Sequence, residues 1–240
     1  MVTMLPGPQD SASPSRKIRV RPRFDARLIS PDERHVLDCA FRLRHAVFVR
    51  ELGWVPAAPC HREMDRGDSE ALHFGVFSHI PKAERVDAGR PTLVGYARVL
   101  LPEAGFMLFD EFAAIVDGMP FRPDPQRSFE VSRVVVRSDL RGVRDTDRRT
   151  ALDHLARAIA GWALIHGRDQ WLSVCELRHL RALRFRGFHC VSVGRVVEYQ
   201  PHVPVCAVRV DLSQVVAGLR AHHPHDYAWY REGGHVDGQG

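Results

Sequence analysis

Apolar residues between positions 32 and 52 recur at helical spacing. Leu37, Phe41 and Phe48 fall on one stripe, and this pattern predicts an amphipathic helix over 32–52. Arg44 lies on the same stripe, among side chains that should face the core. A buried guanidinium is costly unless a carboxylate or a substrate anion meets it. The pattern therefore predicts an acidic partner for Arg44.

The remaining patterns predict strands and helices in alternation. Short apolar and β-branched runs predict strands over 72–77, 93–101, 129–137, 171–175, 191–199 and 205–210. Helical spacing predicts helices over 106–117, 151–166 and 176–185. In this order the elements indicate an α/β fold, with helices packed against a mixed sheet as a sandwich.

Both ends of the chain differ in composition from the middle. Residues 1–17 are rich in Pro, Ser and polar residues, and residues 222–240 are rich in Gly and His. Such segments bury too little apolar surface to fold alone, so each is expected to be a flexible tail. Residues 18–221 are expected to form one domain, because 240 residues suffice for a single large core.

Composition argues against several classes of protein. Five cysteines without a CxxC pair favour reduced thiols over a disulfide framework or a thiolate metal site. No apolar run approaches about 18 residues, so we expect a cytoplasmic protein without stable membrane insertion. Lys and Arg number 34 against 29 Asp and Glu, and the resulting net charge of +5 is low for a dedicated nucleic-acid binder.

Three carboxylates crowd one predicted loop, namely those of Glu63, Asp65 and Asp68. Such crowding needs cations or hydrogen-bond donors nearby, because like charges disfavour one another's ionised form. Three arginines could supply the positive charge: Arg44, Arg98 and Arg133.

Several short motifs share a characteristic spacing from residue 44 to residue 133. They are RHAVF at 44–48, LGW at 52–54, the acids at 63, 65 and 68, GYARVLLP at 95–102, FML at 106–108 with Phe112 following, and EVSR at 130–133. Together these motifs resemble the signature of acyl-homoserine-lactone synthases. Any one of them alone would be weak evidence.

The resemblance implies a fold and a reaction. The fold is a single-domain GNAT-like α/β/α sandwich, whose central mixed sheet is splayed to admit the phosphopantetheine arm of an acyl donor. In the reaction the amine of S-adenosylmethionine attacks an acyl thioester. Its carboxylate then closes on the carbon next to the sulfonium, releasing methylthioadenosine and an N-acyl-homoserine lactone. No cofactor is implied beyond these two substrates.

The amine determines the chemistry that the site must supply. An α-amine with a pKa of about 8 is mostly protonated at neutral pH and must lose its proton to attack. Glu130 is the candidate catalytic base. Strand alternation places Glu130 and Arg133 on opposite faces of their strand unless a bulge brings them together.

Carboxylates, aromatic rings and arginines are the candidates for substrate binding. Asp65 and Asp68 could hold the ammonium or the arginines, while the rings of Phe48 and Trp54 suit an adenine or a sulfonium. An arginine could grip the substrate carboxylate as a fork. The predicted substrate-binding residues are Arg44, Phe48, Trp54, Asp65, Asp68, Arg98, Phe112 and Arg133.

The sequence indicates the acyl donor less clearly than the amine substrate. Residues 140–144 resemble part of the pyrophosphate loop of coenzyme-A acetyltransferases but lack its second glycine, so acyl carrier protein is favoured and acyl-CoA stays open. Arg178, Arg181 and Arg184 line one edge of a predicted helix and suit an acidic carrier, although a solvated helix face accounts for them equally well.

The histidines near the C-terminus are not expected to bind metal. His222, His223 and His225 are interrupted by Pro224, and no acidic or cysteine partner is suitably spaced to complete a site.

Two other functions remain open. A long-chain N-acyl amino acid synthase would share the fold and Glu130 but acylate a free amino acid, and His73 together with Arg66-Gly67 leaves this possible. The position of Trp54 after Phe48 favours the lactone synthase. A nonenzymatic basic module for nucleic acid is suggested by the pI of about 9.2, but the sequence holds no recognisable nucleic-acid motif.

Overall fold

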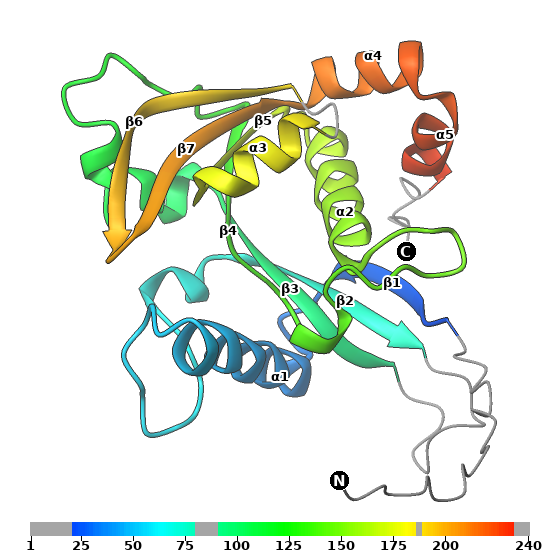
Figure 1. Cartoon of the computed structure of the whole chain (residues 1–240), viewed down its shortest axis with the longest axis horizontal. Helices are drawn as coiled ribbons and strands as arrows, with labels where there is room; N and C mark the ends of the chain where they lie inside the picture. Colours follow the sequence, from blue (N-terminus) through cyan, green and yellow to red (C-terminus); the bar gives the residue numbers. More distant parts are fainter. Residues whose placement is uncertain (1–20, 80–90, 186–188, 233–240) are drawn as a thin grey trace, which may run out of the picture.

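A computed structural model of the chain describes residues 21–79, 91–185 and 189–232 (Figure 1). Its seven strands form one sheet in the order β1-β2-β3-β4-β5-β7-β6. They are β1 (Arg23–Leu28), β2 (Leu72–His79), β3 (Thr92–Leu100), β4 (Ser128–Val136), β5 (Gln170–Glu176), β6 (Cys190–Gln200) and β7 (Val203–Asp211). The helices are α1 (Arg34–Arg44), α2 (Ala151–Ile165), α3 (Leu177–Phe185), α4 (Leu212–His222) and α5 (Pro224–Glu232). Within the described part, no helix combines the length and the apolarity that crossing a membrane requires.

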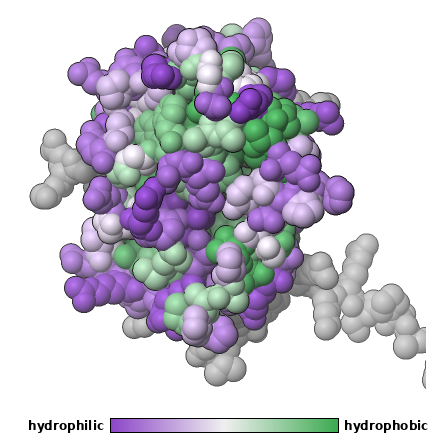
Figure 2. Space-filling model, turned by 90° about the vertical axis from the view of Figure 1, so that its left-hand side faces the viewer, coloured by the Kyte–Doolittle hydropathy of each residue, from purple (hydrophilic) through white to green (hydrophobic). Residues whose placement is uncertain are grey.

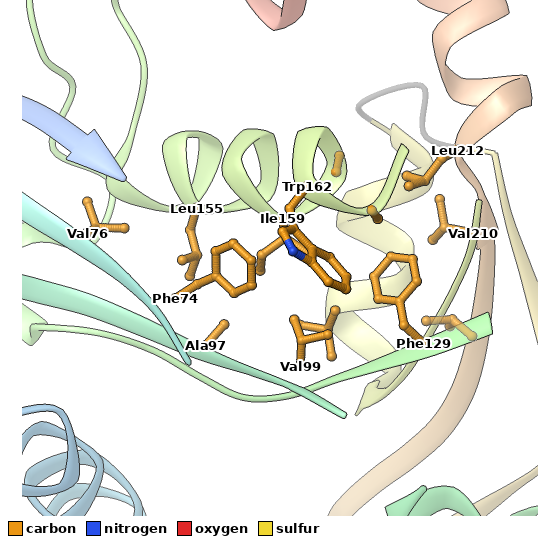
Figure 3. Packing of buried hydrophobic residues seen from close by; sticks show 14 of the residues in the cluster. Phe74, Val76, Ala97, Val99, Phe129, Leu155, Ile159, Trp162, Val210 and Leu212 are labelled. Carbon is orange, nitrogen blue, oxygen red and sulfur yellow. The ribbon is translucent and has the colours of Figure 1, made fainter. Parts of the chain in front are cut away.

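Helix α2 covers one face of the sheet. Thr150 and Asp153 form a capping box that satisfies the first free amides of this helix, which then extends to Ile165. Its apolar stripe points at the sheet, where the Trp162 ring lies edge-on to Phe74 at 6.2 Å between centroids (Figure 3). Leu155 is only 1% exposed in the same cluster. This layer is the main hydrophobic core of the molecule.

Helix α1 covers the opposite face of β3 and β4 (Figure 1). Val36 and Ala40 pack against Tyr96 and Val135 in a separate buried cluster. The helix predicted over 32–52 is present as α1, continued by a π-helical segment, His45–Glu51. The two layers of helices and the mixed sheet between them confirm the predicted α/β/α sandwich.

The sheet is splayed between β4 and β5. These parallel strands pair only through Ser128–Glu130 and Gln170–Leu172, after which β5 continues beside β7 alone. Just beyond the last pair, the Ser173 hydroxyl donates to the carbonyl of Val131 at 2.8 Å. The sheet is thus splayed as the resemblance implied, and Glu130 lies at the point where its two halves part.

The prediction of a helix over 106–117 is wrong. This segment forms short 3₁₀ turns, Met107–Phe109 and Ala113–Ile115, and buries Leu108 and Ile115 in one hydrophobic cluster. The amide of Leu108 donates to the Glu130 carboxylate at 3.4 Å, and the chain leaves the helical conformation at Asp110, where φ is −124° and ψ is −91°. A tertiary contact has thus overridden the local apolar pattern.

Three further elements, namely β1, α4 and α5, were not expected from the sequence. Strand β1 precedes the first predicted helix and pairs with β2 in antiparallel register. Helix α5 occupies 224–232, so the flexible tail predicted from residue 222 is wrong for these residues. Its Trp229 ring lies 4.6 Å from the guanidinium carbon of Arg149 and 4.1 Å from that of Arg157. The predicted tail at 1–17 and residues 233–240 lie outside the described residues.

Candidate active site

A bulge in β4 brings Arg133 to the side of the sheet that faces the acidic loop. Tyr96 of β3 is opposite Val135 while Arg98 is opposite Ser132, so β4 holds one residue more than β3 over this stretch. Arg133 occupies the extra position with φ of 52°, which few residues other than glycine adopt. The bulge interrupts the strict alternation that would have placed Glu130 and Arg133 on opposite faces of β4.

Arg44 is fully buried and bonded to two carboxylates, as predicted. Its Nε donates to Glu63 Oε2 at 2.5 Å and its Nη1 to Asp68 Oδ1 at 2.6 Å. The Nη2 of Arg44 is buried and has no hydrogen-bond partner among the described residues, with Asp65 Oδ2 lying 3.9 Å away. One donor of this guanidinium is therefore not engaged by the protein.

Arg98 and Arg133 complete the set of arginines around the acids. Arg98 Nη1 donates to Asp65 and, at 3.0 Å, to Asp68 Oδ1. Arg133 donates from Nε to Glu63 Oε1 at 3.1 Å and from Nη2 to Asp65 Oδ2 at 2.7 Å. We refer to Arg44, Glu63, Asp65, Asp68, Arg98 and Arg133 as the ion-pair network. Its three positive and three negative charges balance, which makes its burial tolerable.

A single 3₁₀ turn, Arg66–Ser69, orients two of the acids. Asp65 Oδ1 accepts from Gly67 N at 2.9 Å, and Asp68 Oδ2 accepts from Asp65 N at 2.7 Å. A Cβ added at Gly67 would lie 3.3 Å from both Arg98 Nη1 and Asp65 Oδ1, so a larger residue would crowd this ion pair. The small residue in this turn therefore leaves room for Arg98, which Asp65 and Asp68 bind.

Aromatic rings adjoin the ion-pair network. Trp54 stacks on Phe48 with centroids 6.2 Å apart and an interplanar angle of 25°. The guanidinium carbon of Arg133 lies 5.9 Å from the centre of the Phe48 ring. Tyr199 of β6 meets Trp54 edge-on at 6.2 Å and Phe112 at 5.1 Å. These rings are half-buried, so they form a partly accessible aromatic wall.

Tyr199 was not predicted as a site residue. It follows Arg133 by a long stretch in which the family motifs thin out, and no local pattern distinguishes it from other apolar strand positions. Its hydroxyl donates to Glu111 Oε1 at 3.0 Å, and Glu111 Oε2 lies 3.8 Å from Arg133 Nη2. Burial raises the pKa of the Tyr199 hydroxyl to about 12, so it remains a hydrogen-bond donor at neutral pH.

Glu130 is buried where the sheet splays, with 1% of its surface exposed. Burial raises the pKa of its carboxyl to about 7, and the backbone amides of Leu108 and Met107 offset part of this rise. Met107 also connects Glu130 to the network, because its sulfur accepts from Arg98 Nη2 at 2.9 Å. A carboxylate with a pKa near neutrality can both take up and release a proton under physiological conditions.

The arginines of α3 lie apart from this site. Arg178 pairs with Glu176 at 2.6 Å, and Arg184 Nε donates to the carbonyl of Cys190 at 3.2 Å. Arg181 is exposed. The role of these residues in carrier binding stays a prediction.

Apolar patches gather on the face at the left of Figure 1, and Figure 2 shows them above and below a band of hydrophilic residues. A hollow of about 450 Å³ lies beside the segment that leads to Met107. Its lining includes Pro102, Phe106, Phe109, Pro123 and Pro125, with Arg66 and Asp110 also contributing.

Comparison with known proteins agrees with this architecture. Residues 43–149 match the family model described as an acetyltransferase (GNAT) domain. The acyl-homoserine-lactone synthase LasI superposes with a TM-score of 0.64 at 18% identity, covering 80% of this chain and 91% of that chain. BjaI, a CoA-dependent acyl-homoserine lactone synthase solved with SAM and isopentyl-CoA, gives 0.63 at 22% identity, covering 88% and 89%.

An N-acyl amino acid synthase has the same fold. FeeM, from uncultured soil microbes, superposes with a TM-score of 0.57 at 18% identity, covering 83% of this chain and 97% of that chain. No curated protein sequence matches the chain. The structural likeness confirms the predicted fold class, and the match of residues 43–149 to an acetyltransferase domain agrees with the predicted resemblance. The activity and its substrates have to be argued from the residues of the site.

Proposed function

We propose that this chain, which has the fold of acyl-homoserine-lactone synthases, acylates the amine of S-adenosylmethionine and closes the product to a lactone. One observation carries the proposal. A buried carboxylate with a pKa of about 7, the ion-pair network and the Trp54–Phe48 stack are linked by direct contacts at the opening between β4 and β5.

Glu130 serves as the base in this proposal. The α-amine, with a pKa of about 8, transfers its proton to a carboxylate of pKa about 7, a mismatch of roughly one unit that costs about 1.4 kcal/mol. The freed nitrogen lone pair forms a bond to the thioester carbonyl carbon. The carbon–sulfur bond of the thioester then breaks, and the leaving thiolate takes up a proton.

The second step forms the lactone. A carboxylate oxygen of the acylated substrate bonds to the carbon next to the sulfonium, and that carbon–sulfur bond breaks to release neutral methylthioadenosine. No external oxidant or cofactor is needed. Arg133, whose side chain is the most exposed of the three arginines in the ion-pair network, is suited to orient the substrate carboxylate as a fork.

The aromatic wall suits the rest of the substrate. A sulfonium within about 6 Å of a ring face gains roughly 0.5–2 kcal/mol from the ring's quadrupole, and an adenine stacks on the same surface. Trp54 and Phe48 lie next to Arg133 and are only half-buried, so their rings are accessible. A free amino acid offers neither group to such a wall.

Acyl carrier protein is the favoured donor. Backbone amides of the turn just before α2, beside the helix end that could bind a coenzyme-A pyrophosphate, are already engaged by carboxylates. Asp153 accepts from Thr150 N at 2.8 Å, and Asp145 Oδ1 accepts from Asp147 N at 3.0 Å and Arg149 N at 2.8 Å. The exposed arginines of α3 would meet an acidic carrier.

Incubation of the purified protein with acylated carrier and S-adenosylmethionine tests the proposal. We expect stoichiometric release of methylthioadenosine and an acyl-homoserine lactone. A parallel reaction with acyl-CoA distinguishes the donors. Transfer without methylthioadenosine release would contradict the lactone synthase.

The second candidate is an N-acyl amino acid synthase, favoured by the fold shared with FeeM. It would use Glu130 in the same way but leave the aromatic wall without a ligand. Acylation of a panel of free amino acids, measured beside S-adenosylmethionine, separates the two functions.

A further inference from the structure

His73 lies beneath the ion-pair network and bonds at both ring nitrogens. It comes from β2 and is 8% exposed. Its Nδ1 is 2.7 Å from the Tyr96 hydroxyl, and its Nε2 is 3.0 Å from the backbone carbonyl of Asp68. The function proposed above assigns no role to this side chain.

The partners of His73 determine where its proton sits. A carbonyl oxygen can only accept, so Nε2 must carry the hydrogen that it shares with Asp68. In a neutral ring Nδ1 is then the acceptor, and the Tyr96 hydroxyl donates to it. The neutral ring satisfies both bonds, whereas a protonated ring would present a second donor to the hydroxyl.

Asp68 is the residue that His73 supports. Asp68 Oδ1 receives hydrogen bonds from Arg44 at 2.6 Å and from Arg98 at 3.0 Å, and Oδ2 receives the amide of Asp65. With its carbonyl held by His73, Asp68 is anchored at both its side chain and its backbone. A shift of this turn would move Arg44 and Arg98 with it.

Burial, together with two nearby guanidinium groups, opposes protonation of His73. Arg44 faces it from α1, Arg98 and the Tyr96 hydroxyl from β3, and Asp68 from the 3₁₀ turn, while the Phe41 ring lies edge-on at 6.0 Å. Burial lowers the pKa of the His73 imidazole; Asp68 raises it, and the two guanidinium groups lower it further.

We propose that His73 is a positioning residue that, as a neutral imidazole bridging Tyr96 and Asp68, sets the geometry of Arg44 and Arg98 for binding the amine substrate. This inference rests on the proposed function for its ligand. The bridge acts through the turn, so it would serve either an S-adenosylmethionine or an amino acid site. His73 therefore does not favour one of these functions over the other.

Three variants test the bridge. His73→Phe removes both hydrogen bonds and should raise the KM for the amine substrate tenfold or more, with the KM for the acyl donor changed less than twofold. His73→Gln offers one donor and one acceptor without titrating, and should recover most of the loss. Tyr96→Phe removes only the donor to Nδ1 and should raise the pKa of the His73 imidazole, as measured from the ¹⁵N shifts of its ring.

His154→Phe is the matched control. His154 is 4% exposed and bonded to Asp145 at 2.7 Å, away from the network, so its replacement should lower stability without selectively raising the KM for the amine. Equal KM changes in the His73 and His154 variants would overturn the proposal. So would an unchanged KM in a folded His73→Phe protein.

An NMR measurement tests the His73 bridge without relying on activity, so it separates failure of the bridge from failure of the proposed function. In ¹⁵N-labelled protein, the His73 ring should show the Nε2–H tautomer, and its pKa should lie below the ordinary value of about 6.5. Titration of His73 at that ordinary value, or the opposite tautomer, refutes the bridge. If the tautomer is found but no acyltransfer occurs, the bridge stands and the proposed function fails.

Discussion

Arg44 shows how much a single residue can predict. A guanidinium on an apolar stripe requires an acidic partner, and the structure supplies Glu63 and Asp68. The same reasoning predicted that acids at 65 and 68 would need arginines, and Arg98 and Arg133 meet them. Residue types with a high cost of burial are thus informative even when their partners lie far along the chain.

Glu130→Gln tests the catalytic base. We expect acyl transfer to fall by about a hundredfold or more, because the amide cannot accept the amine's proton. The wild-type kcat/KM should rise with pH through about 7, where the carboxyl ionises. Steady-state rates across pH 5.5–8.5 check both points. Turnover within a fewfold of wild type would remove Glu130 from this role.

Trp54→Ala tests the aromatic wall. Loss of one ring face should weaken S-adenosylmethionine binding by about 5- to 30-fold, corresponding to roughly 1–2 kcal/mol. Isothermal titration calorimetry gives the dissociation constant directly. Trp229→Ala is a suitable control, because that ring packs on α2 rather than on the network. An unaltered constant would assign Trp54 to the core.

At the scale of elements, helices and strands with long periodic patterns were predicted well, and short irregular segments were not. Helix α2 and strands β2 and β3 lie within one or two residues of their predicted bounds. The segment 106–117 differs because its amides and apolar side chains serve separate tertiary contacts. Local spacing alone cannot indicate that the chain will leave the helical conformation at Asp110, between the two 3₁₀ turns.

Helix α5 yields a prediction at this scale. Trp229 sits against Arg149 and Arg157 and edge-on to His154, while Arg149 pairs with Asp226 at 2.5 Å. Trp229→Ala should therefore lower the free energy of unfolding by about 1–3 kcal/mol. Denaturant unfolding measures this, with Tyr227→Ala on the same helix as control. Equal effects of both changes would indicate that Trp229 has no special part in docking α5.

At the scale of the whole molecule, Glu130 makes stability depend on pH. The folded state holds its proton up to a pKa of about 7, whereas the unfolded chain releases it near 4.5. The stability associated with this proton is present below pH 4.5 and is lost as the pH rises through 7. The loss amounts to about 3 kcal/mol at most.

Glu130→Gln should remove this dependence. Relative to wild type, the variant is expected to gain about 2–3 kcal/mol in free energy of unfolding between pH 5 and pH 8. Chemical denaturation at the two pH values measures the change. If the difference in free energy of unfolding between the two proteins is the same at pH 5 and pH 8, Glu130 titrates normally in the folded state.

The sequence by itself determined the order of most elements, the sandwich class and which charged residues must find partners, because periodicity and burial cost are local properties of the chain. Only the tertiary structure decided the bulge at Arg133, the joining of Tyr199 to Trp54 and the raised pKa of Glu130. These depend on strand register and on contacts between segments far apart in sequence. Such distances are set when the sheet assembles, and no local pattern encodes them.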